Sequence, residues 1–127
     1  MQHAPGFIRL CEASRARIRE VEPDEVAAAL AAGATLVDVR EDHEWAGGHL
    51  PGAVHLGRGV IERDAEHRWP DPATPLVLYC GGGYRSALAA DALQQLGFSD
   101  VRSLAGGVRR WQAEGRPWQA GAGGTGG

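Results

Sequence analysis

The chain has 127 residues, a length that can bury one hydrophobic core without disulfides or a structural metal. Its 13 basic and 16 acidic residues leave a formal charge of −3, which provides no electrostatic basis for nucleic-acid binding. The basic residues counted here are all arginine, so the chain lacks the lysine of a Walker-type phosphate loop and of a Schiff-base enzyme.

The sequence also bears on the cellular compartment. No stretch approaches the roughly 20 apolar residues of a membrane-spanning helix, and the first residues lack the pattern of a signal peptide. The two cysteines, Cys11 and Cys80, do not make a disulfide framework. We therefore expect a cytoplasmic protein with reduced thiols and no membrane partner.

The first predicted elements are a helix and an edge strand. Residues 7–16 favour a helix, and we treat residues 1–17 as a helical extension of the main domain. The residues expected on one side of this helix are Phe7, Leu10, Cys11 and Ser14. Charged and apolar residues alternate over 17–21, which is typical of a short edge strand.

A second helix opens at Pro23, whose fixed backbone suits the first helical position, and ends at Gly33. Its predicted apolar stripe consists of Val26, Ala27, Leu30 and Ala31. Residues 35–39 are short, apolar and β-branched, as in a buried strand. A short helix over 41–46, a turn over 47–52 and a strand over 53–56 follow.

The second half of the chain contains the clearest core strand, Leu76–Tyr79. Before it lies a polar stretch over 57–75, with a short helix around 60–64. After it, residues 86–96 predict a helix with one apolar face, formed by Leu88, Ala89, Ala92, Leu93 and Leu96. A last strand (101–104), a last helix (108–114) and a glycine-rich tail (119–127), predicted to be disordered, complete the chain.

Strands that alternate with helices predict an α/β fold, with a parallel sheet and helices on both faces. Active sites in such sheets lie at the carboxyl ends of the strands. Cys80 is the first residue after the clearest core strand. The predicted topology therefore places this thiol where catalytic groups are found.

The loop after this strand has a composition suited to holding an anion. Gly81, Gly82 and Gly83 allow the backbone to curl so that successive amides point inward, and a helix follows at once. Arg85 adds a positive charge, and Ser86 is a predicted helix N-cap. We expect these groups to favour the thiolate form of Cys80 and to stabilise an anion bound to its sulfur.

Three other interpretations of these residues are weaker. A purely structural cysteine would need neither the glycines nor the arginine. A dinucleotide-binding loop would use Gly81, Gly83 and Ser86, but serine replaces the third glycine. A metal site is not expected, because the six-residue spacing of the histidines matches no common ligand pattern; these are His43, His49 and His55.

Four segments, in order, resemble the signatures of the rhodanese-like domain family. The first runs from Asp38 through Trp45, and the second covers residues 48–53. The third is the loop Cys80-Gly81-Gly82-Gly83-Tyr84-Arg85-Ser86. The closing segment is residues 104–107 together with Trp111. The resemblance covers about residues 18–118, which we predict to be one rhodanese domain.

The resemblance implies a five-stranded parallel sheet and a sulfurtransferase that needs no cofactor. Cys80 would take a sulfane sulfur from thiosulfate or a thiol persulfide, hold it as a persulfide, and pass it to cyanide or a thiol, including a protein thiol. The amides of Gly81 to Arg85 would surround the outer sulfur. Related phosphatases and arsenate reductases carry a loop one residue longer, so the shorter loop here favours sulfur over phosphate. A non-catalytic protein-binding module is the main alternative.

Asp38 and Arg40 are two further candidates for a supporting role at this site. Asp38 could bond the loop amides and Arg40 could attract anionic donors, or the two could form an ion pair that orders the loop. Trp45 and Trp111 are interpreted as packing residues, and Cys11 as a buried residue of the first helix. Because the three loop glycines carry no charge, thiosulfate and a thiol persulfide are equally plausible donors.

Overall fold

A computed structural model describes residues 3–121 of the chain. Five parallel strands form one sheet in the order β1-β5-β4-β2-β3, as predicted for the α/β fold. The strands are β1 (Arg19–Val21), β2 (Thr35–Asp38), β3 (Val54–His55), β4 (Leu76–Tyr79) and β5 (Val101–Leu104). The central strand β4 is buried along its whole length, which matches its uninterrupted apolar sequence.

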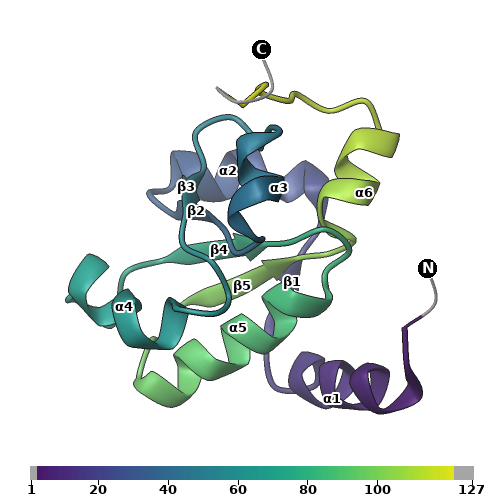
Figure 1. Cartoon of the computed structure of the whole chain (residues 1–127). Helices are drawn as coiled ribbons and strands as arrows, with labels where there is room; N and C mark the ends of the chain where they lie inside the picture. The colour runs from purple at the N-terminus through teal and green to yellow at the C-terminus, as the bar shows by residue number, and fades with distance from the viewer. Residues whose placement is uncertain (1–2, 122–127) are drawn as a thin grey trace.

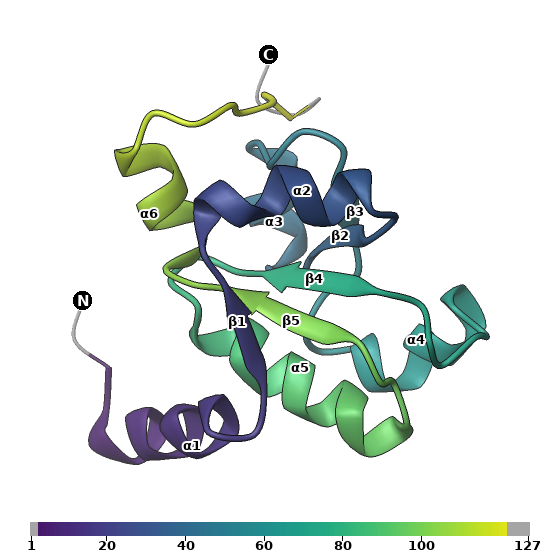
Figure 2. The same ribbon diagram turned by 180° about the vertical axis from the view of Figure 1, so that it is seen from behind.

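Helices cover both faces of the sheet (Figures 1 and 2). They are α1 (Pro5–Arg15), α2 (Val26–Ala31), α3 (Asp42–Ala46), α4 (Ile61–Arg68), α5 (Tyr84–Leu96) and α6 (Gly107–Ala113), and a short 3₁₀ helix, η1 (Pro23–Glu25), precedes α2. Helices α4 and α5 lie on one face, while α2, α3 and α6 lie on the other. Helix α1 lies alongside α5.

The alternation of side chains along β4 divides the core between the two faces. Leu76, Leu78 and Cys80 pack toward α4 and α5. Val77 and Tyr79 pack toward α2 and α6. This period of two follows from the pleat of a strand, and it places the Cys80 side chain on the same face as the start of α5.

Most predicted elements are present, with ends displaced by one or two residues. The larger differences lie in the second half of the chain. The helix predicted around 60–64 continues to Arg68, because Ile61 and Ala65 are both buried and hold its inner face. The helix predicted from Ser86 begins at Tyr84, because Gly83 already adopts the conformation that starts it.

Parts of three predicted apolar faces were wrong. Leu10 is 56% exposed and Leu96 is 37% exposed, although each was assigned to an inner face. In α2 the buried residues are Val26 and Ala29, whereas Ala27 and Ala31 face solvent. A helix this short contacts its neighbours through a narrow stripe, which Val26, Ala29 and the partly buried Leu30 occupy.

The C-terminal segment packs further than predicted. Gln119, assigned to the disordered tail, exchanges two backbone hydrogen bonds of 2.9 Å with His49. Residues 122–127, the rest of that predicted tail, lie outside the described residues. Among the described residues, no helix is long and apolar enough to cross a membrane.

Candidate active site

The sulfur of Cys80 lies inside a curl of backbone immediately after β4. The amide of Gly83 donates a hydrogen bond to Sγ at 3.1 Å, and the amide of Ser86 donates a longer one at 3.4 Å. The thiol is also 3.5 Å from the Ser86 hydroxyl oxygen. Only 1% of the Cys80 residue surface is exposed, so these contacts replace water around the sulfur. Two inward-pointing amides stabilise a negative charge at this position.

The curl depends on the backbone conformation of Gly83. Its φ of 94° lies in the left-handed region, and it forms the N-cap of α5. A Cβ atom there would lie only 3.3 Å from the amide nitrogen of Gly106. The first turn of the 13-residue helix α5 consequently starts at the thiol, with its free amides and positive dipole end facing the sulfur.

Ser86 has a different role from the predicted N-cap. It lies within the first turn of α5, and Gly83 occupies the cap position. The Ser86 hydroxyl is fully buried and lies 2.8 Å from the hydroxyl of Ser103 on β5. A residue inside the turn cannot cap it, so the side chain instead links the loop to the neighbouring strand.

The closing segment of the chain holds the loop from the other side. The amide of Val108 donates to the Cys80 carbonyl, and the amide of Arg109 donates to the Gly81 carbonyl, both at 2.9 Å. Gly107 makes this approach possible, because a Cβ atom on it would collide with the carbonyl oxygens of Cys80 and Gly81. The glycines of this segment thus allow α6 to bind the active-site loop.

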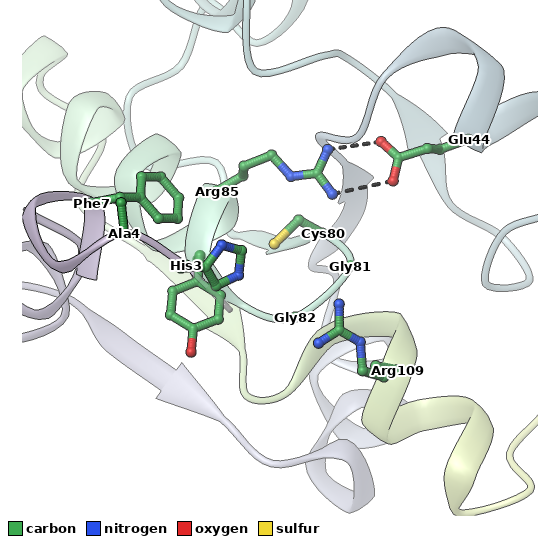
Figure 3. Close-up of a pocket in the computed structure, with 10 residues that line it drawn as sticks. His3, Ala4, Phe7, Glu44, Cys80, Gly81, Gly82, Arg85 and Arg109 are labelled. Atoms are coloured by element: carbon green, nitrogen blue, oxygen red, sulfur yellow. Dashed lines mark hydrogen bonds and ion pairs between the residues drawn. The ribbon is translucent and has the colours of Figure 1, made fainter. Parts of the chain in front are cut away.

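Arg85 pairs with Glu44 of α3 at the edge of the site. The guanidinium bonds the two carboxylate oxygens of Glu44 at 2.7 and 3.2 Å (Figure 3). This hydrogen-bonded pairing lowers the pKa of Glu44 from 4.5 to about 2. The positive charge predicted for the loop is therefore largely neutralised by its partner.

Asp38 and Arg40 form a buried ion pair with each other. The shortest contact is 2.8 Å, and the Arg40 guanidinium also donates to the carbonyl of Gly48 at 2.6 Å. Neither side chain lines the cavity described below. Of the two roles considered from the sequence, this geometry favours the ion pair, which ties β2 to the turn before β3.

A cavity of about 450 Å³ opens in front of Cys80 (Figure 3). Its lining includes the predicted loop residues Cys80, Gly81, Gly82, Tyr84 and Arg85. Sequence reasoning missed the others, which are His3, Ala4, Phe7, Glu44 and Arg109. Arg109 lies just after the glycine pair of the closing family segment, so the sequence did contain a signal for its position near the loop. His3 and Phe7 come from a distant segment, and no local pattern connects them to the loop.

The contacts of His49, His55 and Trp45 agree with the packing and hydrogen-bonding roles predicted for them. The His49 ring nitrogen Nδ1 lies 2.9 Å from the Leu50 carbonyl, and Nε2 of His55 lies 2.8 Å from the Arg40 carbonyl. Trp45 stacks on His49 with ring centres 3.7 Å apart. Over residues 3–121, no group of three or more His, Cys, Asp or Glu side chains is placed to hold a metal ion.

Two other predicted packing residues are buried. Cys11 has no exposed surface, and burial raises the pKa of its thiol. Trp111 is nearly covered, and its indole nitrogen donates to the Pro117 carbonyl at 2.7 Å. Both side chains fill space between elements, as expected from the sequence.

Comparison with known families identifies the fold and its signatures. The model of the rhodanese-like domain matches residues 22–114. The chain belongs to the rhodanese-like domain family. All four sequence segments described above fall within the matched range, whereas helix α1 lies outside it.

Relatives within the rhodanese-like family have named activities. The chain is 34% identical over 99 residues to the thiosulfate sulfurtransferase GlpE of Stutzerimonas stutzeri, covering 74% of this chain and 84% of that protein. It is 37% identical over 94 residues to the thiosulfate sulfurtransferase GlpE of Pseudomonas syringae pv. syringae, covering 74% and 87%. The predicted classification as a rhodanese-type sulfurtransferase is thus confirmed at the level of the family.

A solved structure resembles the rhodanese-like chain over most of its length. The polysulfide-sulfur transferase homodimer of Wolinella succinogenes superimposes with a TM-score of 0.75 at 29% identity, covering 89% of this chain and 86% of that one. The five-stranded fold predicted from the four segments is therefore shared with a sulfur-transferring relative.

Proposed function

We propose that this protein transfers a sulfane sulfur through a persulfide on Cys80. The observation that carries the proposal is the pair of amides, from Gly83 and Ser86, that donate to the Cys80 sulfur. The same donors that favour a thiolate would favour the persulfide anion that replaces it. The names of the curated relatives, which are thiosulfate sulfurtransferases, support this assignment.

The proposed first half-reaction is a displacement at sulfur. The Cys80 thiolate attacks the outer sulfur of thiosulfate, a new S–S bond forms, and the S–S bond of the donor breaks. Sulfite leaves with the bonding electron pair, and Cys80 keeps the sulfur as a persulfide anion. In the second half, cyanide or a thiolate attacks the outer sulfur and regenerates the Cys80 thiolate.

The enclosed position of the sulfur fits this two-step cycle. A persulfide is readily lost to other thiols in water, and a nearly covered Cys80 limits that side reaction. The outer sulfur would extend toward the amides of Gly81 to Arg85 and the open cavity. We place the reaction in the cytoplasm, because both cysteines of the chain are unpaired thiols.

The test is mass spectrometry of the intact protein after incubation with thiosulfate, and then with cyanide. We expect one sulfur atom to be added at Cys80 and then lost as thiocyanate. Cys80→Ser should take up none, while Cys11→Ala serves as a control that removes the other thiol. If neither thiosulfate, mercaptopyruvate nor glutathione persulfide adds sulfur to Cys80, the proposal is wrong.

The same preparation separates the alternative functions. Hydrolysis of an aryl phosphate faster than sulfur transfer would assign the site to phosphate chemistry. A partner protein that binds Cys80→Ala as tightly as the unsubstituted chain, with no sulfur uptake by the latter, would assign a binding module instead.

A further inference from the structure

One wall of the cavity comes from outside the family-matched range. Helix α1 and the two residues before it bring His3 and Phe7 against Tyr84 of the Cys80 loop. The ring centres are 4.5 Å apart for His3 and Tyr84, 5.2 Å for His3 and Phe7, and 5.9 Å for Phe7 and Tyr84. These three rings, which we call the aromatic wall, make one side of the cavity broad and largely apolar.

The aromatic wall is fixed in place by the docking of α1 on α5. Ser14 donates to the buried carboxylate of Asp91 at 3.0 Å, and Arg17 pairs with the same carboxylate at 2.6 Å. Arg15 places its guanidinium 4.7 Å from the centre of the Tyr84 ring. The helix is therefore tied both to α5 and to the loop residue that its aromatic side chains contact.

Helix α6 contributes a cation, Arg109, to the lining of the cavity. The Arg109 guanidinium reaches over Gly82, within 3.7 Å of the point where a Cβ atom would stand (Figure 3). Within residues 3–121, the Arg109 side chain makes no ion pair, whereas the charge of Arg85 is taken by Glu44. The cavity thus combines an apolar side, the Cys80 sulfur and one positive charge that has no ion-pair partner in the described part of the chain.

We propose that the aromatic wall selects an organic persulfide in preference to thiosulfate, and that Arg109 binds a carboxylate on that organic donor. This deepens the proposed function, on which it rests. A cavity of about 450 Å³ falls in the size range of small-molecule sites and greatly exceeds a small inorganic anion. Thiosulfate gains nothing from aromatic rings, whereas the organic part of a persulfide can cover them while its carboxylate meets Arg109.

The chemical step for such a donor is the same displacement. The Cys80 thiolate attacks the outer sulfur of R–S–SH, the new S–S bond forms, and the S–S bond of the donor breaks. The outer sulfur keeps its proton, and the R–S⁻ thiolate leaves with the electron pair. The aromatic wall and Arg109 act on the R group, so they affect donor binding and leave the sulfur displacement itself unchanged.

The first experiment compares Phe7→Ala with the unsubstituted protein, using glutathione persulfide and thiosulfate as donors. We expect KM for glutathione persulfide to rise about fivefold to tenfold, with kcat little changed. The kinetic constants for thiosulfate should stay within about twofold. Leu10→Ala is the control, because Leu10 lies on the same helix and is exposed away from the cavity.

The second experiment tests the carboxylate with Arg109→Gln, an exposed residue whose replacement leaves the core intact. We expect kcat/KM to fall about fivefold for glutathione persulfide and to stay unchanged for the persulfide of 2-mercaptoethanol, whose organic part is uncharged. Arg63→Gln, on the exposed side of α4, is the matched control.

The outcomes distinguish failure of the donor selectivity from failure of the proposed function. Equal losses for both donors in Phe7→Ala, or no loss in either variant, would overturn the selectivity of the wall while Cys80 still takes up sulfur. Absence of sulfur uptake by the unsubstituted protein from every donor would instead overturn the proposed function.

Discussion

Arg85 and Glu44 form an ion pair at the edge of the Cys80 cavity, with contacts of 2.7 and 3.2 Å. The two residues come from α5 and α3, on opposite faces of the sheet. Their pairing neutralises the arginine that lies nearest to Cys80 in the sequence. It follows that the loop amides, rather than a guanidinium, provide the main stabilisation of charge on that sulfur.

Releasing Arg85 should make the site more attractive to anionic donors. In Glu44→Gln the guanidinium loses its carboxylate partner, so we expect KM for thiosulfate to fall severalfold at low ionic strength. The gain should shrink as salt is added, because the interaction is partly exposed. Steady-state kinetics over a range of ionic strength test this. Glu62→Gln, which breaks the exposed pair with Arg58, should leave KM unaltered.

The same ion pair predicts how stability depends on acid. The pKa of Glu44 is lowered from 4.5 to about 2, so its pairing stabilises the fold fully above pH 4.5 and is lost as the pH falls toward 2. Because the pair is about one third exposed, we expect a contribution of about 1 kcal/mol. Urea unfolding between pH 5 and 2 should show a steeper loss for the unsubstituted protein than for Glu44→Gln. Parallel curves would refute the prediction.

Gly83→Ala should show that the loop geometry is needed for sulfur uptake, beyond the loss of stability that backbone strain causes at any such glycine. The substitution forces a left-handed residue with a side chain against Gly106, and we expect about 1–2 kcal/mol of destabilisation together with loss of sulfur uptake. Gly33→Ala is the matched control, because Gly33 has φ 106° and nothing within 4 Å of an added Cβ atom. Gly33→Ala should lose stability by strain alone and keep full activity. Equal activity in the two variants would contradict the role of Gly83.

Asp91 should control the docking of α1. Asp91→Asn weakens the contacts with Ser14 and Arg17, and we expect about 1–2 kcal/mol of destabilisation. Hydrogen exchange should accelerate in residues 5–15 more than in the sheet strands. Asp64→Asn, which breaks an exposed pair with Arg63, is the control. Unchanged exchange in α1 would show that apolar packing alone holds the helix.

Local sequence patterns were sufficient for the parts of the site that lie along one segment. Gly83, the last of three glycines between a buried strand and a helix, has the left-handed conformation of the curl that brings two amides to the Cys80 sulfur. The burial of Cys11 and the central position of β4 followed from apolar patterning. Leu10 and Leu96 were misassigned, because a helical face is covered only where a neighbouring element reaches it.

The sequence by itself determined the fold family, and it predicted the reactive thiol and the loop that holds it. These depend on short-range properties: the four segments that resemble the family, strand and helix periodicity, and the backbone freedom of glycine. Only the tertiary structure decided the partner of Arg85 and the wall formed by His3 and Phe7. Those contacts join residues whose meeting depends on how the elements pack, which no local pattern encodes.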